Sequence, residues 1–203
     1  MIKTLIFDFG DVFINLDKTG AMENALQLFE LEHFETDMLQ TNIEYEIGKL
    51  STLDFISFYK SKFPKLTETQ IKDAWNYIIK DFPLNRLKFA QKLSENNNFK
   101  LILLSNTNEM HIDYIKKNVS FYDEFKSCFD VFYLSHEIHL RKPNTNIYQF
   151  VLDENTLYAS ECIFVDDTKE NTDAAKKLGF HVWNLDENNE DVINLFETKT
   201  HLF

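Results

Sequence analysis

Four groups of polar residues could do chemistry in this chain, and each comes after a short apolar run. They offer a carboxylate, a hydroxyl with an amide, a lysine ammonium and a pair of carboxylates, all of which can bind a phosphate or a hard cation. In chain order they are Asp8, Ser105 with Asn106, Lys142, and Asp166 with Asp167. None of them is decisive alone, so the elements that position them matter.

Five short apolar runs predict buried strands, and helical periodicity lies between the later ones, with one helix expected to open at Pro143. This alternation is typical of a parallel sheet covered by helices on both faces, so the predicted class is α/β, a Rossmann-like three-layer α/β/α core. Sites in such sheets form at the carboxyl ends of strands, where the polar groups fall. The five runs are Thr4–Phe9, Lys100–Leu104, Val131–Leu134, Cys162–Val165 and His181–Leu185.

The segment Asn15–Phe82 separates the first two predicted strands and contains only helical patterns. The sequence after Thr67 resembles a capping box at the start of the last of these helices. We therefore expect a core of residues 1–14 and 85–203 and an inserted helical cap of residues 15–84. The helical patterns lie around Leu26–Leu31, Leu53–Tyr59 and Ile71–Ile79.

The composition excludes several classes of function. The 203 residues carry a formal net charge of -12, so the overall field does not favour nucleic acid or an anionic membrane. An anionic substrate would need a metal or a few placed lysines and arginines. Cys128 and Cys162 lie in apolar contexts and are predicted to be free thiols of a reducing cytosol. No signal peptide or run of roughly 18 apolar residues is expected, so the predicted location is cytoplasmic, as a monomer or homodimer.

The ordered motifs resemble those of the haloacid dehalogenase superfamily of phosphohydrolases over nearly the whole chain. The resemblance is carried by "LSNTN", "RKPNTNIYQFVL" and "VDDTKENTDAAKKLGF". It is strongest for the branch with a helical cap after the first strand, which includes bacterial alpha-D-glucose-1-phosphate phosphatases. The order of motifs is specific for the superfamily and much less specific for the substrate.

This resemblance implies a role for each residue. Asp8 would be the nucleophile that forms an aspartyl-phosphate, and Lys142 would offset negative charge on the nucleophile and the transferring phosphoryl group. The Ser105 hydroxyl and the Asn106 amide or backbone would hold phosphoryl oxygens. Mg²⁺ would be bound by Asp8, the Gly10 carbonyl and Asp167, with Asp166 in or beside this metal site and Asn171 supporting the acidic loop.

One position departs from the usual superfamily pattern. Most phosphatases of the superfamily carry an aspartate two residues after the nucleophile, which protonates the leaving group and later activates water. Gly10 occupies that position here, as in the glucose-1-phosphatase-like branch. The acid/base therefore stays unidentified, and Asp11 would serve only if the backbone turned sharply there.

Several neighbouring residues are expected to be structural. Arg141 is interpreted as a salt-bridge partner, and His136 and His139 as histidines without a metal. Glu46 could reach the substrate from the cap, but its interpretation as part of a solvated acidic face is favoured. Relatives often carry Arg where this chain has Ile47, which weakens the transfer of glucose-1-phosphate as the substrate.

Alternative functions use the same residue types. A dehalogenase of this fold would run metal-free ester chemistry and would not need Asp166 and Asp167. A phosphorylation-receiver domain would place its acidic pair after the first strand and would lack the insert. Gly10 keeps open a non-catalytic relative that binds a phosphorylated ligand, and disfavours a mutase. We expect a Mg²⁺-dependent phosphomonoesterase acting on a small phosphorylated metabolite, such as a sugar phosphate.

Overall fold

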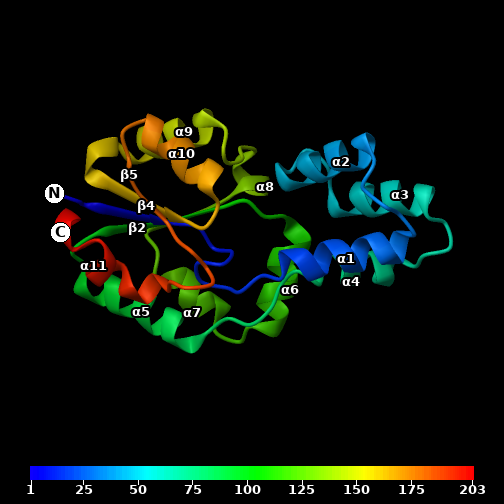
Figure 1. Ribbon diagram of the computed structural model, residues 1–203, viewed down its shortest axis with the longest axis horizontal. Helices are drawn as coiled ribbons and strands as arrows, with labels where there is room; N and C mark the ends of the chain where they lie inside the picture. Colours follow the sequence, from blue (N-terminus) through cyan, green and yellow to red (C-terminus); the bar gives the residue numbers. More distant parts are fainter.

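A computed structural model describes residues 1–203 and has a five-stranded, fully parallel sheet at its centre (Figure 1). The strand order is β3-β2-β1-β4-β5, so the first strand lies in the middle. The strands are β1 (Thr4–Phe7), β2 (Lys100–Ser105), β3 (Val131–Leu134), β4 (Cys162–Asp166) and β5 (His181–Asn184). All five predicted strands are confirmed, and the first ends at Phe7, two residues earlier than predicted.

Alternate residues of the central strands pack into separate hydrophobic clusters on the two faces of the sheet. Leu5 and Phe7 of β1 belong to the cluster beneath α5 and α7, whereas Ile6 belongs to the cluster beneath α9 and α10. This alternation follows from the pleat of a strand and confirms the predicted three layers. The helices of these layers are α5 (Leu84–Asn96), α6 (Glu109–Asn118), α7 (Tyr122–Ser127), α9 (Thr145–Asn155) and α10 (Lys169–Lys177).

Short helical turns complete the core. Pro143 does not open α9 as predicted, because Asn144 is still extended (φ -60°, ψ 132°) and the helix begins at Thr145. The turns are α8 (Ser135–Ile138), α11 (Leu195–Thr198) and the 3₁₀ segments η1 (Ala159–Glu161), η2 (Val192–Asn194) and η3 (Thr200–Leu202). Cys128 and Cys162 are buried free thiols. No helix has the length and apolar character needed to cross a membrane.

The insert after β1 holds four helices, which lie together beyond one end of the sheet (Figure 1). They enclose an aromatic cluster that includes Phe29, Phe55 and Tyr59. The capping box at Thr67 is present. The helices are α1 (Lys18–Phe29), α2 (Thr36–Glu46), α3 (Thr52–Lys62) and α4 (Glu68–Asn76).

The sequence predicted three of these helices and missed α2. That helix buries only Met38, Thr41 and Tyr45, so its apolar stripe is too thin for a periodicity argument. The division at residues 14/15 and 84/85 stays a prediction. Ile79 belongs to the hydrophobic cluster of the sheet and pairs with Leu16, so the segments that lead into and out of the insert lie against the core.

Candidate active site

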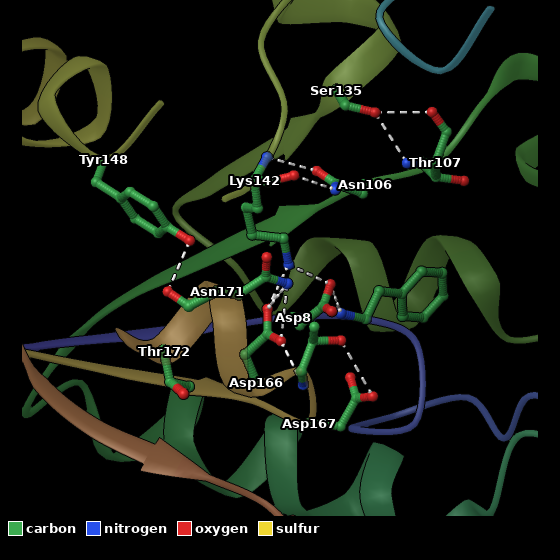
Figure 2. Close-up of polar contacts among 12 residues, drawn as sticks. Asp8, Asn106, Thr107, Ser135, Lys142, Tyr148, Asp166, Asp167, Asn171 and Thr172 are labelled. Carbon is green, nitrogen blue, oxygen red and sulfur yellow. Dashed lines mark hydrogen bonds and ion pairs between the residues drawn. The ribbon is translucent and has the colours of Figure 1, made fainter. Parts of the chain in front are cut away.

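The carboxyl edge of the sheet brings together a carboxylate–lysine–carboxylate group (Figure 2). Lys142 Nζ lies 2.8 Å from Asp8 Oδ1 and 2.7 Å from Asp166 Oδ2. Asp8 follows β1, and Asp166 ends β4, the neighbouring strand. The Lys142 side chain is fully buried. Three predicted site residues from distant parts of the sequence therefore form one ion-pair network.

Asp166 has both carboxylate oxygens engaged within the protein. Oδ1 accepts hydrogen bonds from the Thr168 backbone N–H (2.8 Å) and from Asn171 Nδ2 (3.0 Å). Oδ2 accepts from Lys142 Nζ and lies 3.1 Å from Asn171 Nδ2. The Asn171 side chain thus fixes the acidic loop, as the resemblance implied. Because both oxygens of Asp166 are occupied by hydrogen bonds, this carboxylate fixes the orientation of the Lys142 and Asn171 side chains.

Asp8 is anchored at only one of its two oxygens. Oδ1 accepts from the Phe9 backbone N–H (2.7 Å) and pairs with Lys142, whereas Oδ2 has no partner within the protein. Burial raises the pKa of Asp8; Lys142 opposes this rise, and Asp166 and Asp167 add to it. Burial also opposes the charge on Lys142, but the two carboxylates outweigh it and raise the pKa of the ammonium group. Lys142 therefore remains the cation beside Asp8.

Asn106 holds Lys142 in place through two backbone contacts. Its Nδ2 donates to the Lys142 carbonyl (2.9 Å), and its Oδ1 accepts from the Lys142 N–H (2.9 Å). The Asn106 amide is therefore not free to hold a phosphoryl oxygen, but its backbone N–H has no partner. Ser105 ends β2 and is a buried residue, and its hydroxyl makes no hydrogen bond within the protein.

Gly10 lies where the chain turns away from the sheet. Its N–H and its carbonyl oxygen make no hydrogen bond within the protein. A Cβ at this position would lie 2.6 Å from the Leu16 Cδ1 atom, so the turn fits only glycine unless Leu16 moves. The turn leaves both polar atoms of Gly10 available at the edge of the sheet.

Asp11 and Asp167 share a lysine that the sequence analysis did not single out. Lys18 Nζ lies 2.8 Å from Asp11 Oδ2 and also contacts Asp167 Oδ2. Burial opposes the charge on Lys18, but the hydrogen bonds to both carboxylates raise its pKa. The backbone does turn sharply at Asp11 (φ 53°), yet the turn aims its carboxylate at Lys18 and at the Leu16 N–H. Both carboxylate oxygens of Asp11 are therefore engaged within the protein, and a part for Asp11 in acid/base chemistry stays a prediction.

Two adjoining pockets open at this edge. The first has a volume of about 400 Å³ and the second about 200 Å³, and they share Gly10, Leu16 and Asn106. The first is lined by Asp8, Gly10, Leu16, Lys18, Asn106, Arg141, Lys142, Pro143, Asp167, Thr168, Glu170 and Asn171. The second is lined by Phe9, Gly10, Ile14, Leu16, Glu46, Ile78, Ile79, Ser105, Asn106, Thr107, Asn108, His111 and Ile115.

The inserted helices are tied to the core beside these pockets. Arg141 Nε donates to Glu46 Oε1 (3.0 Å), which confirms Arg141 as a salt-bridge partner. The Ser135 hydroxyl lies 2.7 Å from the Glu46 carbonyl oxygen and accepts from the Thr107 N–H at 2.9 Å. Glu46 is therefore part of the pocket wall and not of a solvated acidic face, because α2 ends against the core.

His111 carries no charge at neutral pH. Its Nε2 lies 3.0 Å from the Trp75 carbonyl oxygen, and its Nδ1 lies 3.2 Å from Asn108 Nδ2. Burial lowers the pKa of His111 to about 4. A ring that donates to Trp75 and accepts from Asn108 is neutral, so His111 connects α6 with the end of α4 without adding charge.

The parallel sheet, the acid–lysine–acid network and the helices tied over it define a capped α/β enzyme. The model of the family described as haloacid dehalogenase-like hydrolase matches residues 2–179. The chain is 31% identical over 192 residues to D-ribitol-5-phosphate phosphatase of Bacteroides thetaiotaomicron, covering 90% of this chain and 91% of the relative. This protein therefore belongs to the haloacid dehalogenase-like hydrolase family, as its motifs predicted.

Solved structures are similar over nearly the whole chain. A haloacid dehalogenase family enzyme of Bacteroides thetaiotaomicron, in complex with magnesium and inorganic phosphate, has a TM-score of 0.84 at 30% identity. That comparison covers 97% of this chain and 100% of the other. A predicted haloacid dehalogenase-like hydrolase of Porphyromonas gingivalis has a TM-score of 0.80 at 26% identity, covering 100% of this chain and 98% of the other.

Proposed function

We propose that this protein is a Mg²⁺-dependent phosphomonoesterase in which Asp8 attacks phosphorus and forms an aspartyl-phosphate. The anchoring of Asp8 carries the proposal. Oδ1 is held by Phe9 and Lys142, while Oδ2 is free and the residue lines the 400 Å³ pocket. A carboxylate fixed through one oxygen and free at the other is oriented for attack on a bound phosphoryl group.

The residues at the pocket fit a magnesium ion. The Gly10 carbonyl oxygen and Asp167 Oδ1 make no hydrogen bond within the protein. They would bind the ion as two of three protein oxygens, and the third would be the carboxylate oxygen of Asp8 that does not attack phosphorus. Carboxylate oxygens of Asp8, Asp166 and Asp167 lie within 4.8 Å of one another. Oxygen ligands suit Mg²⁺, which keeps several of its waters. When bound, Mg²⁺ would offset the repulsion between the attacking carboxylate and the phosphate.

Free donors beside Asp8 suit the phosphoryl oxygens. The Lys142 ammonium, the Ser105 hydroxyl and the backbone N–H groups of Gly10 and Asn106 belong to residues that line the two adjoining pockets. They come from the turn after β1, the end of β2 and the loop before α9. They would stabilise the negative charge of the transferring group, in the way that preorganised donors do in other enzymes. Asp166 would act through Lys142, whose orientation it fixes.

The smaller pocket favours a substrate whose leaving group carries no acidic group in addition to the transferred phosphate. Its charged wall residue is Glu46, whose carboxylate is paired with Arg141. His111 is neutral there. A second anion would enter without a free positive partner, which costs binding free energy. The likeness to a D-ribitol-5-phosphate phosphatase supports the same substrate class, a sugar or polyol monophosphate.

Phosphate release from a panel of esters tests this function. The panel contains ribitol 5-phosphate, hexose phosphates, a sugar bisphosphate, a phosphorylated hydroxy acid and an aryl phosphate, each with Mg²⁺ or with EDTA. We expect Mg²⁺-dependent release, with kcat/KM for the neutral polyol esters about tenfold above that for esters with a second acid. Failure to cleave even the aryl phosphate would contradict the phosphatase function and favour the alternative, a non-catalytic protein that binds a phosphorylated ligand.

Three variants control the panel. Asp8→Asn should abolish release, whereas Asp173→Asn, at an exposed acid paired with Lys169, should not change it. Glu46→Gln removes the charge in the smaller pocket. The difference in kcat/KM between neutral esters and esters with a second acidic group should then become smaller. An unchanged difference in Glu46→Gln would exclude Glu46 as the source of substrate selection.

A further inference from the structure

Lys18 brings a positive charge from the inserted helices into the phosphate pocket. It is the first residue of α1, and its ammonium group bridges Asp11 and Asp167. Among the residues that line the larger pocket, it alone is both cationic and part of the helices α1–α4. Its own side chain is 48% exposed, whereas the two carboxylates are 7% exposed. The lysine therefore borders solvent while it contacts the mostly buried acids.

The chain is built to hold Lys18 there. Asp11 adopts a left-handed backbone conformation (φ 53°), which is uncommon for residues other than glycine. Its Oδ1 accepts from the Leu16 N–H at 2.8 Å, so only Oδ2 remains for Lys18. Asp11 thus anchors the ammonium group beside Asp167 and forms no hydrogen bond or ion pair with Asp8 or Lys142.

Lys18 and the metal would share one carboxylate. Lys18 contacts Oδ2 of Asp167, and Oδ1 of the same residue is one of the three oxygens assigned above to Mg²⁺. A positive charge on one oxygen reduces the attraction that the carboxylate exerts on a cation at the other. The same charge attracts a phosphate in the pocket, so the effects of Lys18 on the two ligands have opposite signs.

The charge balance of the site makes these effects large. Four carboxylates (Asp8, Asp11, Asp166 and Asp167) face two lysines, which leaves two negative charges uncompensated. Mg²⁺ would neutralise them, and a phosphate dianion would restore them. Without Lys18, a third negative charge would attract the metal and repel the phosphate.

We propose that Lys18 is a positioning residue which, through Asp167, weakens Mg²⁺ binding and strengthens the binding of phosphate. The proposal rests on the phosphatase function proposed above. It assigns to the first inserted helix a part in the charge balance of the site, in addition to any part in covering the substrate.

Isothermal titration of the metal-stripped full chain tests the proposal with two ligands. Mg²⁺ is titrated first, and inorganic phosphate is then titrated at saturating Mg²⁺. Lys18→Gln should bind Mg²⁺ about tenfold more tightly and phosphate about tenfold more weakly than the unmodified protein. Lys18→Arg keeps the charge and should leave both affinities within about twofold.

A matched control separates this effect from general damage. Lys80 forms a similar pair with Asp17 away from the pocket, so Lys80→Gln should leave both affinities unchanged. If Lys18→Gln lowers the affinities for both Mg²⁺ and phosphate, or changes neither affinity, the proposal is wrong although the phosphatase function stands. If the unmodified chain binds no Mg²⁺, the proposed function fails and the Lys18 proposal with it.

Discussion

The carboxyl edge of the sheet and the interior of the inserted helices are stabilised in different ways. At the edge, Lys142 is fully buried between Asp8 and Asp166, and each group depends on partners from other elements. Inside the insert, aromatic rings pack on one another, as in the pairs Tyr45–Phe55 (4.2 Å between centroids) and Tyr59–Trp75 (4.7 Å). A buried charge cannot lose its partner cheaply, whereas an apolar cluster tolerates changes of similar volume.

This difference separates the two tasks of the enzyme. The edge has to keep one arrangement of charges for phosphoryl transfer. The insert contributes Glu46 and Lys18 to the pocket walls. Its interior is a hydrophobic cluster without catalytic groups. We therefore expect substrate choice to depend more on the insert than on the edge of the sheet. The predictions below test how far the two regions behave independently.

The largest effect should come from the nucleophile. Asp8→Asn should lower phosphate release by at least about 1,000-fold, because the amide is a poor nucleophile. The fold should survive, since the asparagine oxygen can still accept from the Phe9 N–H and from Lys142. Initial rates with saturating Mg²⁺, beside thermal denaturation of both proteins, measure the two quantities. Residual activity near that of the unmodified enzyme would exclude Asp8 as the nucleophile.

The next largest effect should come from the buried lysine. Lys142→Met leaves Asp8 and Asp166 facing each other without a cation, and the free energy of unfolding should fall by about 3 to 5 kcal/mol. Urea denaturation measures it. The exposed pair of Lys169 with Asp173 is the matched control, and Lys169→Met should cost less than about 1 kcal/mol. Equal losses of unfolding free energy in Lys142→Met and Lys169→Met would mean that the buried ion pairs at the sheet edge stabilise the fold no more than an exposed pair does.

A smaller effect should appear at the junction of the two regions. The pKa of His111 in the folded chain (about 4) lies below its ordinary value of 6.5, so the unfolded chain binds the proton more readily. The contribution of neutral His111 to stability is complete above pH 6.5 and is lost as the pH falls toward 4. Between pH 7 and pH 5 the loss should be about 2 kcal/mol.

Urea denaturation at the two pH values measures this loss. In His111→Gln, the free energy of unfolding should fall between pH 7 and pH 5 by that amount less than in the unmodified protein. In His181→Gln, at an exposed histidine, the fall should equal that of the unmodified protein. An identical decrease in His111→Gln and the unmodified protein would mean that the junction does not respond to protonation.

The smallest effect should come from the interior of the insert. Tyr59 is fully buried and donates to Asn42 Oδ1 at 2.7 Å. Tyr59→Phe loses this hydrogen bond and should cost about 1 kcal/mol in the free energy of unfolding. Cleavage of an aryl phosphate should stay within about twofold. A large loss of that activity would show that the interior of the insert and the sheet edge are coupled.

The sequence predicted the parts of the site that follow from strand order. The carboxyl ends of parallel strands meet at one edge, so Asp8, Lys142 and Asp166 could be expected to converge there once the apolar runs were identified as strands. The ordered motifs then indicated the family. The partner of Arg141 was not predictable, because it lies on α2, a helix whose apolar pattern is weak.

Other features depend on contacts that no local pattern contains. Lys18 reaches Asp167 across 149 positions of sequence. Asn106 was expected at the phosphoryl group, yet its amide is used by the Lys142 backbone, since the loop before α9 lies against the end of β2. A signal for Lys18 did exist: it is a cation that follows Asp8 closely in the sequence, at the start of the first inserted helix.

Chemical trapping of the covalent intermediate tests the central claim most directly. Borohydride reduces an acyl phosphate to an alcohol, so an aspartyl-phosphate at position 8 would be converted to homoserine. The enzyme is quenched with borohydride during turnover of its best ester, and its peptides are sequenced by mass spectrometry. We predict homoserine at position 8, and none there without substrate or with EDTA in place of Mg²⁺. Efficient turnover with an unmodified Asp8, or with the reduced residue elsewhere, would contradict the account.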